Sequence, residues 1–409
     1  LAAELWGALP SSMVYVRHNA RLLEIVHLFT LVWGSGVTLG VLYQMAPVIL
    51  AAQLHSVRLG WTTLTLFVPG SLLLALSFRS FWLAGVIAGG VLVIGGALLF
   101  LYNIARTLAA SLERSVTSKY FVAAIASLIG TLAFGIAMAA ALRLGAGYEL
   151  VRRLLLSHLF LGGAGWFAGI IIAVSYKLVP MFLLVHGHGE GFASRLLAVL
   201  YAGVALGVLG SVWGVPGGAL PGVMLVLAAV VMWAVDMAGM WKKRVRRPDV
   251  WLRQVPAAIA FMVLAALGAA ACAVFDAAGG TVQPRAMLAV GALFALGSVS
   301  AMIIAFLHKI VPFLVWYHRY SGAAGRGPVP AMKDLVNEDV GRVVFPVYHA
   351  AAGLIAVGAG LGWTVLARFA AVALLLAGAL LVHDVERLIL PVEGLRRRLR
   401  AAVGKLPAG

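Results

Sequence analysis

The chain repeats one apolar segment three times, and this repeat limits the folds open to it more than any other feature. Each copy has about 25 residues and lies about 132 residues from the next. The copies end at Pro47, Pro180 and Pro312. A fixed long period indicates one structural unit used three times. Function is therefore expected where the copies differ, chiefly at their histidines.

Alignment on these prolines brings aromatic and polar residues into register. Trp33 aligns with Trp166, and Tyr43 aligns with Tyr176. His308 takes the tyrosine position in the third copy. We expect the tryptophans to be packing residues and His308 to be a polar group at a helix contact. Further matches are Gly36 with Gly169, Gly165 with Gly297, Lys177 with Lys309 and Val179 with Val311.

The composition is that of an integral membrane protein, with 63% hydrophobic and 11% charged residues. Backbone groups in lipid must be hydrogen-bonded internally, so the membrane segments are expected to be helices. The sequence predicts an all-α integral membrane fold and one transmembrane domain over residues 1–409. Its three repeat copies lie in windows at about 22–48, 153–183 and 285–316. The other windows long enough to cross the bilayer, which bring the total to eleven, are about 61–78, 81–103, 119–142, 194–213, 220–241, 254–275, 344–364 and 367–385.

The period also predicts how the helices are grouped. One period spans four helices, an even number, so the three copies run in the same direction across the membrane. Three groups of four make twelve helices in a pseudo-three-fold arrangement. Eleven windows are present in the sequence, so a further helix is expected before Leu1.

Basic residues concentrate in alternate loops, and this pattern predicts the orientation of the chain. The segment 241–247 (WKKRVRR) follows one helix, and the segment 396–400 (RRRLR) lies near the C-terminus. The positive-inside rule places both segments in the cytoplasm, below a bacterial-type inner membrane. Arg143, Arg152 and Arg153 are exceptions to the pattern. Because the loops explain the net charge of +17, the expected partner is the lipid bilayer and not nucleic acid.

Twelve helices in three parallel groups of four, with motif helices at positions 2, 6 and 10, resemble the catalytic (subunit I-like) chain of heme–copper oxidases and nitric oxide reductases. The tenth helix of the C-family oxidases reads roughly H-x-H-x-G-x-x-G-W, followed by Y-x-L-V-P. Phe160 stands at the second histidine of this pattern, whereas in the first copy His27 takes that position. The matching residues of the second copy are His158, Gly162, Gly165, Trp166, Tyr176, Leu178, Val179 and Pro180.

The ligands of that family are only partly present in this chain. In the family, the motif helices supply histidines to a low-spin heme, a high-spin heme and a copper ion, and a neighbouring helix adds a His-His pair. Here Val290 and Ala292 stand at the doubly ligating positions of the third copy, and the sequence contains no His-His pair. The resemblance implies a divergent relative without the standard binuclear site. It would be a candidate oxidoreductase with a respiratory or nitric-oxide-related electron-transfer role, with cytochrome or other respiratory subunits as partners.

His27 and His158 lie on the outward third of long apolar helices, where an ionisable side chain is costly and is by default a functional candidate. Neutral imidazole is the commonest axial ligand of b-type heme. Two histidines at similar depth on parallel helices are therefore candidates to hold one heme between them. The alternative is that each imidazole forms a hydrogen bond with a facing helix or with interfacial water near the membrane boundary.

A second group of histidines follows the repeat prolines on the cytoplasmic side. His55 aligns with His188, and His186 aligns with His318. Imidazoles that converge from three helices are typical of a zinc or copper site. The alternative is that these histidines are solvated residues of interfacial loops.

One carboxylate, Asp236, lies well inside a predicted helix and is expected to face the bundle or a water-filled cavity. It is either part of a proton relay or a hydrogen-bond partner of a neighbouring helix. For the whole chain, the rival to a redox role is a non-redox membrane transporter, or an assembly factor for metal or heme, on the same scaffold. A transporter is expected to contain broken helices or polar pairs at the membrane midplane, and few such features are present in the sequence.

Overall fold

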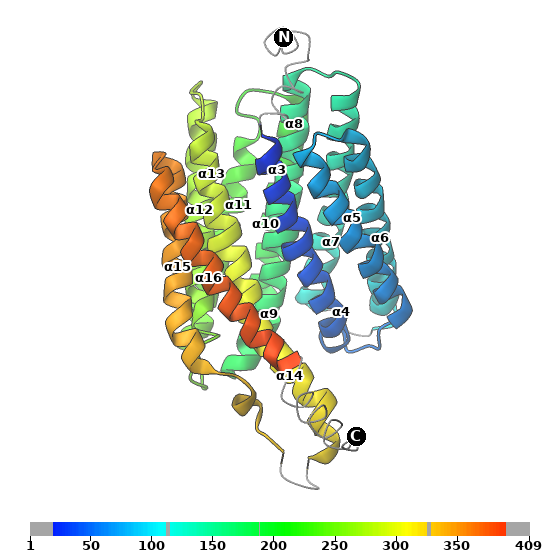
Figure 1. The fold of residues 1–409 in the computed structure, drawn as a ribbon, viewed down its shortest axis with the longest axis vertical. Coiled ribbons are helices and arrows are strands. Elements are labelled where there is room, and N and C mark those ends of the chain that lie inside the picture. The colour runs from blue at the N-terminus through cyan, green and yellow to red at the C-terminus, as the bar shows by residue number, and fades with distance from the viewer. Residues whose placement is uncertain (1–18, 112–114, 188, 325–328, 390–409) are drawn as a thin grey trace, which may run out of the picture. The chain divides into compact units, whose positions relative to one another are not determined.

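The computed structural model describes residues 19–111, 115–187, 189–324 and 329–389. Within these ranges, eleven helices are long and apolar enough to cross a membrane (Figure 1). Each of them overlaps one of the eleven windows expected from the sequence. Over the described residues the prediction of an all-helical fold is confirmed, and the helices have the length and composition of a multi-pass membrane protein.

The helices between and after the repeat copies are single α-helical elements. Several begin with a side-chain cap: Ser56 accepts from the backbone N–H of Leu59, and Ser115 accepts from that of Ser118. The elements are α5 (Val57–Arg79), α6 (Leu83–Ala109), α7 (Val116–Arg143), α10 (Glu190–Trp213), α11 (Leu220–Lys242), α12 (Gln254–Ala277), α15 (Glu338–Leu361) and α16 (Thr364–Ile389).

Each helix that carries a repeat copy is composite, because a π-helical segment interrupts its α-helix. The π segments are η1, η2 and η3, and each begins 19 or 20 residues before the repeat proline. The recurrence of this uncommon backbone form at one place in the repeat supports the sequence alignment, and π-helical segments occur frequently at functional sites. The composite helices are α3 (Ala20–His27), η1 (Leu28–Gly36) and α4 (Val37–Leu50); α8 (Tyr148–Leu159), η2 (Phe160–Ala168) and α9 (Gly169–Leu183); and α13 (Pro284–Ala292), η3 (Leu293–Ser300) and α14 (Ala301–Tyr320).

The first two repeat helices also end in the same way. Ala51 and Leu184 both adopt the left-handed conformation, with φ of 47° and 54°. The following amide donates to the carbonyl of the repeat proline in each case, at 3.3 Å for Pro47 and 3.0 Å for Pro180. A left-handed conformation costs a residue other than glycine roughly 1–2 kcal/mol. The shared helix end is therefore a further property of the first two copies. In the third copy the helix extends farther beyond the proline, from Pro312 to Tyr320.

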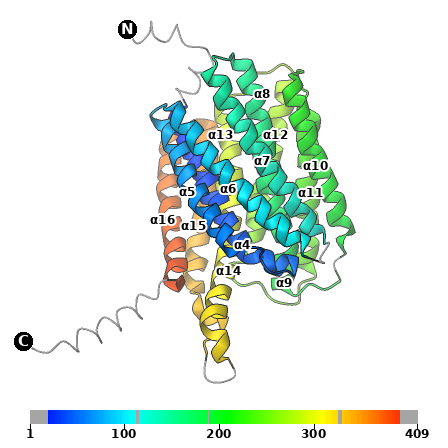
Figure 2. The same ribbon diagram turned by 90° about the vertical axis from the view of Figure 1, so that its right-hand side faces the viewer.

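The second and third helices of each repeat pack together as a hairpin: α5 with α6, α10 with α11, and α15 with α16 (Figure 1 and Figure 2). Small residues allow the backbones to approach closely. A Cβ added to Gly89 would lie 2.7 Å from the carbonyl oxygen of Gly70, and one added to Gly222 would lie 2.3 Å from the backbone nitrogen of Gly207. These glycines are required by the packing of the hairpins.

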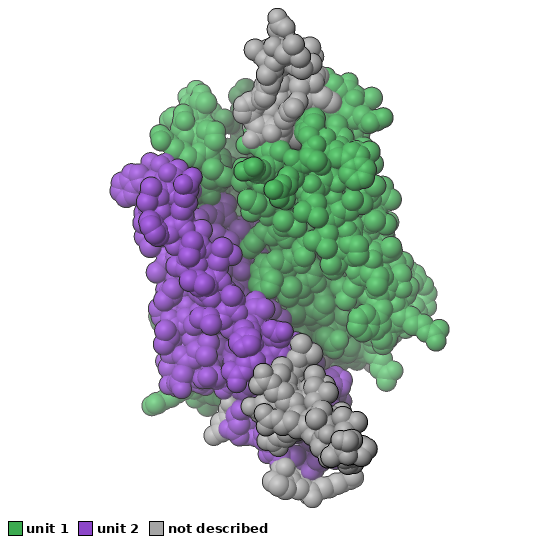
Figure 3. Space-filling view, viewed as in Figure 1, with its two compact units in different colours: residues 1–247, 262–290 green, residues 248–261, 291–409 purple. Residues whose placement is uncertain are grey.

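The chain divides into two compact units, which Figure 3 distinguishes by colour. Unit 1 consists of residues 1–247 and 262–290, and it contains the first two repeat helices. Unit 2 consists of residues 248–261 and 291–409, and it contains the π segment and proline of the third. The single domain and the pseudo-three-fold arrangement expected from the sequence concern the relation between these units and stay predictions.

Candidate functional site

His27 and His158, the candidate heme ligands, lie close together in unit 1. Their ring centroids are 6.5 Å apart, and the ring planes are inclined by 39°. His27 is the last residue of α3 and His158 is the second-last residue of α8, so each stands at the start of a π segment. The sequence predicted only a similar depth in the membrane, and the fold brings the two rings into the same place.

The Nδ1 atom of each ring is held by a backbone carbonyl. His27 Nδ1 lies 2.8 Å from the carbonyl oxygen of Leu23, and His158 Nδ1 lies 2.8 Å from that of Thr131 on α7. Because a carbonyl can only accept, both rings carry a proton on Nδ1, and Nε2 is the atom with the lone pair. Metal-ligating histidines are typically oriented by such a bond to the other ring nitrogen. His158 thus forms the alternative hydrogen bond with a facing helix, α7, whereas the partner of His27 belongs to its own helix, α3.

The distance between the two ring centroids is in the range that two imidazoles bound to one metal ion would have. Two metal–nitrogen bonds of about 2 Å place the centres of the imidazoles roughly 6 Å apart, and the observed separation is 6.5 Å. The surroundings are apolar or small: the ring of Phe78 lies 4.8 Å from that of His27, and Gly135 packs against His158. By donor type and spacing, His27 and His158 are therefore the residues that would hold one heme iron.

The histidines predicted to form an inner metal site are divided between the two units, and one of them is not described. His55 and His186 of unit 1 and His318 of unit 2 are exposed, and His188 lies outside the described residues. Within the described ranges, no group of three or more His, Cys, Asp or Glu side chains is placed to hold a metal ion. The meeting of all four histidines depends on His188 and on both units, and it stays a prediction.

Each repeat helix makes a polar side-chain contact at the residue four positions before its proline. The sequence analysis predicted only part of this pattern. Tyr176 on α9 donates to Asp236 Oδ2 on α11 at 2.7 Å. The alternative of a hydrogen bond between Asp236 and a neighbouring helix is thus confirmed. In the first repeat, the hydroxyl of Tyr43 lies 2.7 Å from Thr63 Oγ1 and also contacts the side chain of Asn103 on α6.

The third repeat has a histidine in the same position. His308 Nε2 faces Asp384 Oδ2 at 3.8 Å. Asn103, Asp236 and Asp384 all belong to the third helix of their repeats, α6, α11 and α16. The sequence did contain a signal for this contact, because Asn103 follows Pro47 at the same interval at which Asp236 follows Pro180. This interval of 56 residues is kept in the first two repeats but not in the third, where Asp384 follows Pro312 by 72 residues.

Tyrosines from the second helix of two repeats brace the π segments. Tyr201 on α10 donates to the carbonyl of Gly165 in η2, and Tyr348 on α15 donates to that of Leu296 in η3, both at 3.0 Å. A π-helical segment perturbs the regular ladder of backbone bonds, so a side-chain donor at this point stabilises it. Tyr201 thus holds the π segment that carries Trp166 and that begins two residues after His158.

Comparison with known proteins supplies no identity for the chain. No model of a known protein family matches it, and no curated protein is significantly similar to it. The relation to heme–copper oxidases therefore rests on the motif residues alone and stays a prediction.

Proposed function

We propose that the chain is a heme-binding redox protein of the bacterial inner membrane, with His27 and His158 as the axial ligands of one b-type heme. The observation that carries the proposal is the pair of imidazoles at 6.5 Å, each fixed through Nδ1 to a carbonyl. A bound heme would supply one-electron transfer or the binding of a small gas molecule.

The residues around the pair orient the ligands before any metal arrives. The carbonyls of Leu23 and Thr131 select the tautomer that leaves Nε2 available. Neutral imidazoles avoid the cost of a charge within the bilayer. The two rings come from different repeat helices, α3 and α8, so the heme would also join the first two repeats.

The basic loops support an orientation in which the heme lies toward the outer face. Both repeat helices would run from outside to inside, and both histidines lie in their first halves. A cytochrome or another respiratory subunit on that side would be the electron donor.

The test is the visible spectrum of protein purified from heme-replete cells. We expect a Soret band and a reduced α-band typical of a six-coordinate heme, with about one heme per chain. His27→Ala and His158→Ala should each lose heme or convert it to a five-coordinate form. His383→Ala is the matched control, because His383 is exposed on α16 and should leave the spectrum unchanged. A colourless wild-type protein would rule out the proposal.

The same preparation separates the redox role from the rival role of a heme or metal assembly factor. An electron-transfer protein keeps its heme through cycles of reduction and oxidation. An assembly factor gives up its heme to an added apoprotein such as apomyoglobin. Rapid transfer without a reversible redox cycle would favour the assembly factor.

A further inference from the structure

Unit 2 contains a buried histidine and aspartate that face each other without a hydrogen bond. The side chains belong to His308 on α14 and Asp384 on α16, which are 2% and 7% exposed. Their nearest atoms, Nε2 and Oδ2, are 3.8 Å apart, and neither atom has a hydrogen-bond partner. From this geometry we propose that His308 and Asp384 form a site that binds one proton. The proposal does not rest on the proposed heme.

The tautomer of His308 is the first step of the argument. Its Nδ1 lies 2.8 Å from the carbonyl oxygen of Ile304, and since a carbonyl only accepts, the Nδ1 proton is committed to this bond. In the neutral ring, Nε2 then presents a lone pair to Asp384. The carbonyl of Leu381, one turn earlier on α16, also faces the ring. If Asp384 were ionised, its carboxylate oxygen would face the lone pair of His308 Nε2, so that two buried acceptors would meet without a proton between them. This arrangement is unfavourable.

One additional proton removes this conflict. On Nε2 it gives an imidazolium beside a carboxylate, and on Oδ2 it gives a carboxylic acid beside a lone pair. When the site takes up a proton, one N–H or O–H bond forms and one O–H bond of a solvent acid breaks. The charge of the pair rises by one, and no electron is transferred. A water molecule that donates to both atoms would hold them roughly 4.5 Å apart, whereas the observed separation is 3.8 Å.

The neighbouring side chains favour the proton without supplying another charge. Trp251 stacks on His308 with ring centroids 3.8 Å apart and planes inclined by 9°, and an indole face attracts a cation. Phe345 meets the same imidazole edge to face at 6.4 Å.

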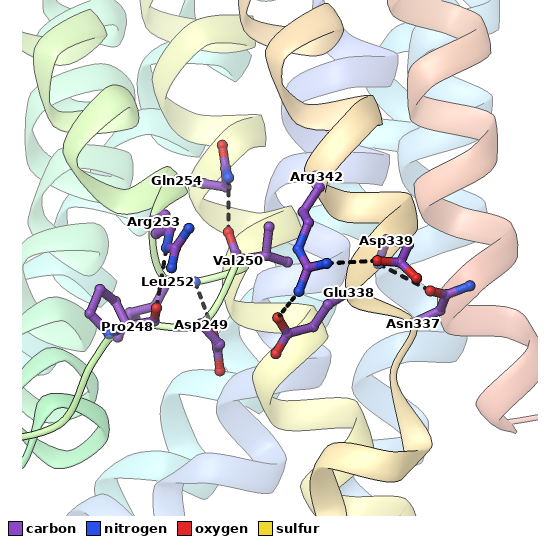
Figure 4. A network of polar contacts seen from close by, with 10 residues as sticks. All are labelled: Pro248, Asp249, Val250, Leu252, Arg253, Gln254, Asn337, Glu338, Asp339 and Arg342. Atoms are coloured by element: carbon purple, nitrogen blue, oxygen red, sulfur yellow. Dashed lines mark hydrogen bonds and ion pairs between the residues drawn. The ribbon is translucent and has the colours of Figure 1, made fainter.

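Trp251 belongs to the turn that precedes α12. Figure 4 shows the polar contacts that hold this turn. Asp249 Oδ1 accepts from the backbone N–H of Leu252 at 3.0 Å, and Gln254 donates to the carbonyl of Val250 at 2.8 Å. This turn gives the indole a fixed position against His308.

The other ionisable groups around the site are engaged elsewhere or lie at the surface. Lys309, next to His308, pairs with Asp249. His349 on α15 pairs with Gln254 at 2.9 Å. His383 and Arg387 flank Asp384 on α16 and are exposed. His308 is therefore the buried group of these elements that can neutralise Asp384 directly.

The equivalent contacts in the other repeats do not require an added proton. Tyr176 brings its own hydroxyl proton to Asp236, and Tyr43 meets the neutral side chains of Thr63 and Asn103. Only the third repeat combines a histidine lone pair with a carboxylate. The repeat has thus changed a structural polar contact into a proton-binding site.

The test combines ¹⁵N nuclear magnetic resonance of labelled histidine with infrared spectroscopy, on the full chain in lipid bilayers near neutral pH. His308→Tyr assigns the His308 signals, because it removes them while it reproduces the Tyr176–Asp236 contact. We expect either an imidazolium at His308 or a carboxylic acid band that is lost in Asp384→Asn. Either result places one proton in the site.

Asp384→Asn supplies the second arm. An asparagine amide donates a hydrogen bond to Nε2, so in this variant His308 should be a neutral ring with its proton on Nδ1, whichever atom holds the added proton in the wild type. Asp236→Asn is the matched control and should leave the His308 signals unchanged. A neutral His308 beside an ionised Asp384 in the wild-type chain would overturn the proposal.

Discussion

The indole nitrogen of Trp166 donates a hydrogen bond of 3.0 Å to Ser35 Oγ, and this bond joins the π segments of the first two repeats. Both side chains are only 1% exposed. Trp166 has a repeat counterpart in Trp33, whereas the counterpart of Ser35 in the second copy is Ala168. The contact is therefore specific to the pairing of η1 with η2, the two segments that begin beside His27 and His158.

Loss of this bond should destabilise unit 1. Trp166→Phe leaves Ser35 unpaired and opens space beside it, so we expect a loss of about 1–3 kcal/mol in the free energy of unfolding. Ser35→Ala should cost about as much, and the double variant should cost less than the sum of the two. Thermal unfolding in detergent or bilayers measures all three. Trp213→Phe, at an exposed tryptophan, is the control, and an additive double variant would contradict the coupling.

The positions of the helices could be predicted because apolar runs of membrane length are a property of local sequence. The windows at 22–48 and 254–275, for example, differ by only a few residues from the observed spans at Ala20–Pro47 and Gln254–Ala277. The third repeat helix was expected to end near residue 316, but it continues to Tyr320. The left-handed end found after Pro47 and Pro180 does not recur there.

The contacts of the site were less predictable, because they depend on distances between helices. Alignment placed His27 and His158 on equivalent helices, but it offset them by two positions, and only the packing of α3 and α8 shows their rings side by side. The π segments were not expected at all, since no residue pattern distinguishes them from an α-helix in the repeat. The contact of Asp384 was not predicted, because the longer loop before α15 increases the number of residues between Pro312 and Asp384 relative to the other two repeats.

The Tyr176–Asp236 bond should depend on the hydroxyl proton. Tyr176→Phe removes the donor and should cost about 1.5–3 kcal/mol, the range for a hydrogen bond to a charged group. Asp236→Asn retains an acceptor for the hydroxyl and should cost less. Unfolding by chemical denaturant ranks the two variants, and a larger loss for Asp236→Asn would contradict this account of the contact.

The orientation can be tested with two reporter fusions. The segments after residues 247 and 405 are separated by four candidate membrane spans: Gln254–Ala277, Pro284–Ala323, Glu338–Leu361 and Thr364–Ile389. An even number of spans returns the chain to the same side, and the basic residues place that side in the cytoplasm. We expect both fusions to report a cytoplasmic location.

Two different failures of this experiment are informative. If both fusions report the periplasm, the spans are correct and the orientation is inverted, so that the candidate heme ligands would lie near the inner face. If the fusions disagree, one of the four helices does not cross the membrane. A fusion in the loop between α12 and α13 should report the opposite side and serves as the control.

The last prediction concerns the metal content of the purified chain and the histidines on the cytoplasmic side. If His55, His188 and His318 meet at one place, they offer three neutral imidazoles and leave a fourth position open, the geometry of a reactive zinc or copper site. The purified wild-type chain should then contain about one such ion, and the triple variant His55→Ala, His188→Ala, His318→Ala should contain none. The bound metal should be lost in acid, because a protonated imidazole is not a ligand. The single variant His383→Ala should retain the ion, since that residue pairs with Glu386 at 3.8 Å and is exposed. Equal metal content in the wild type and the triple variant would return these three histidines to the role of solvated interfacial residues.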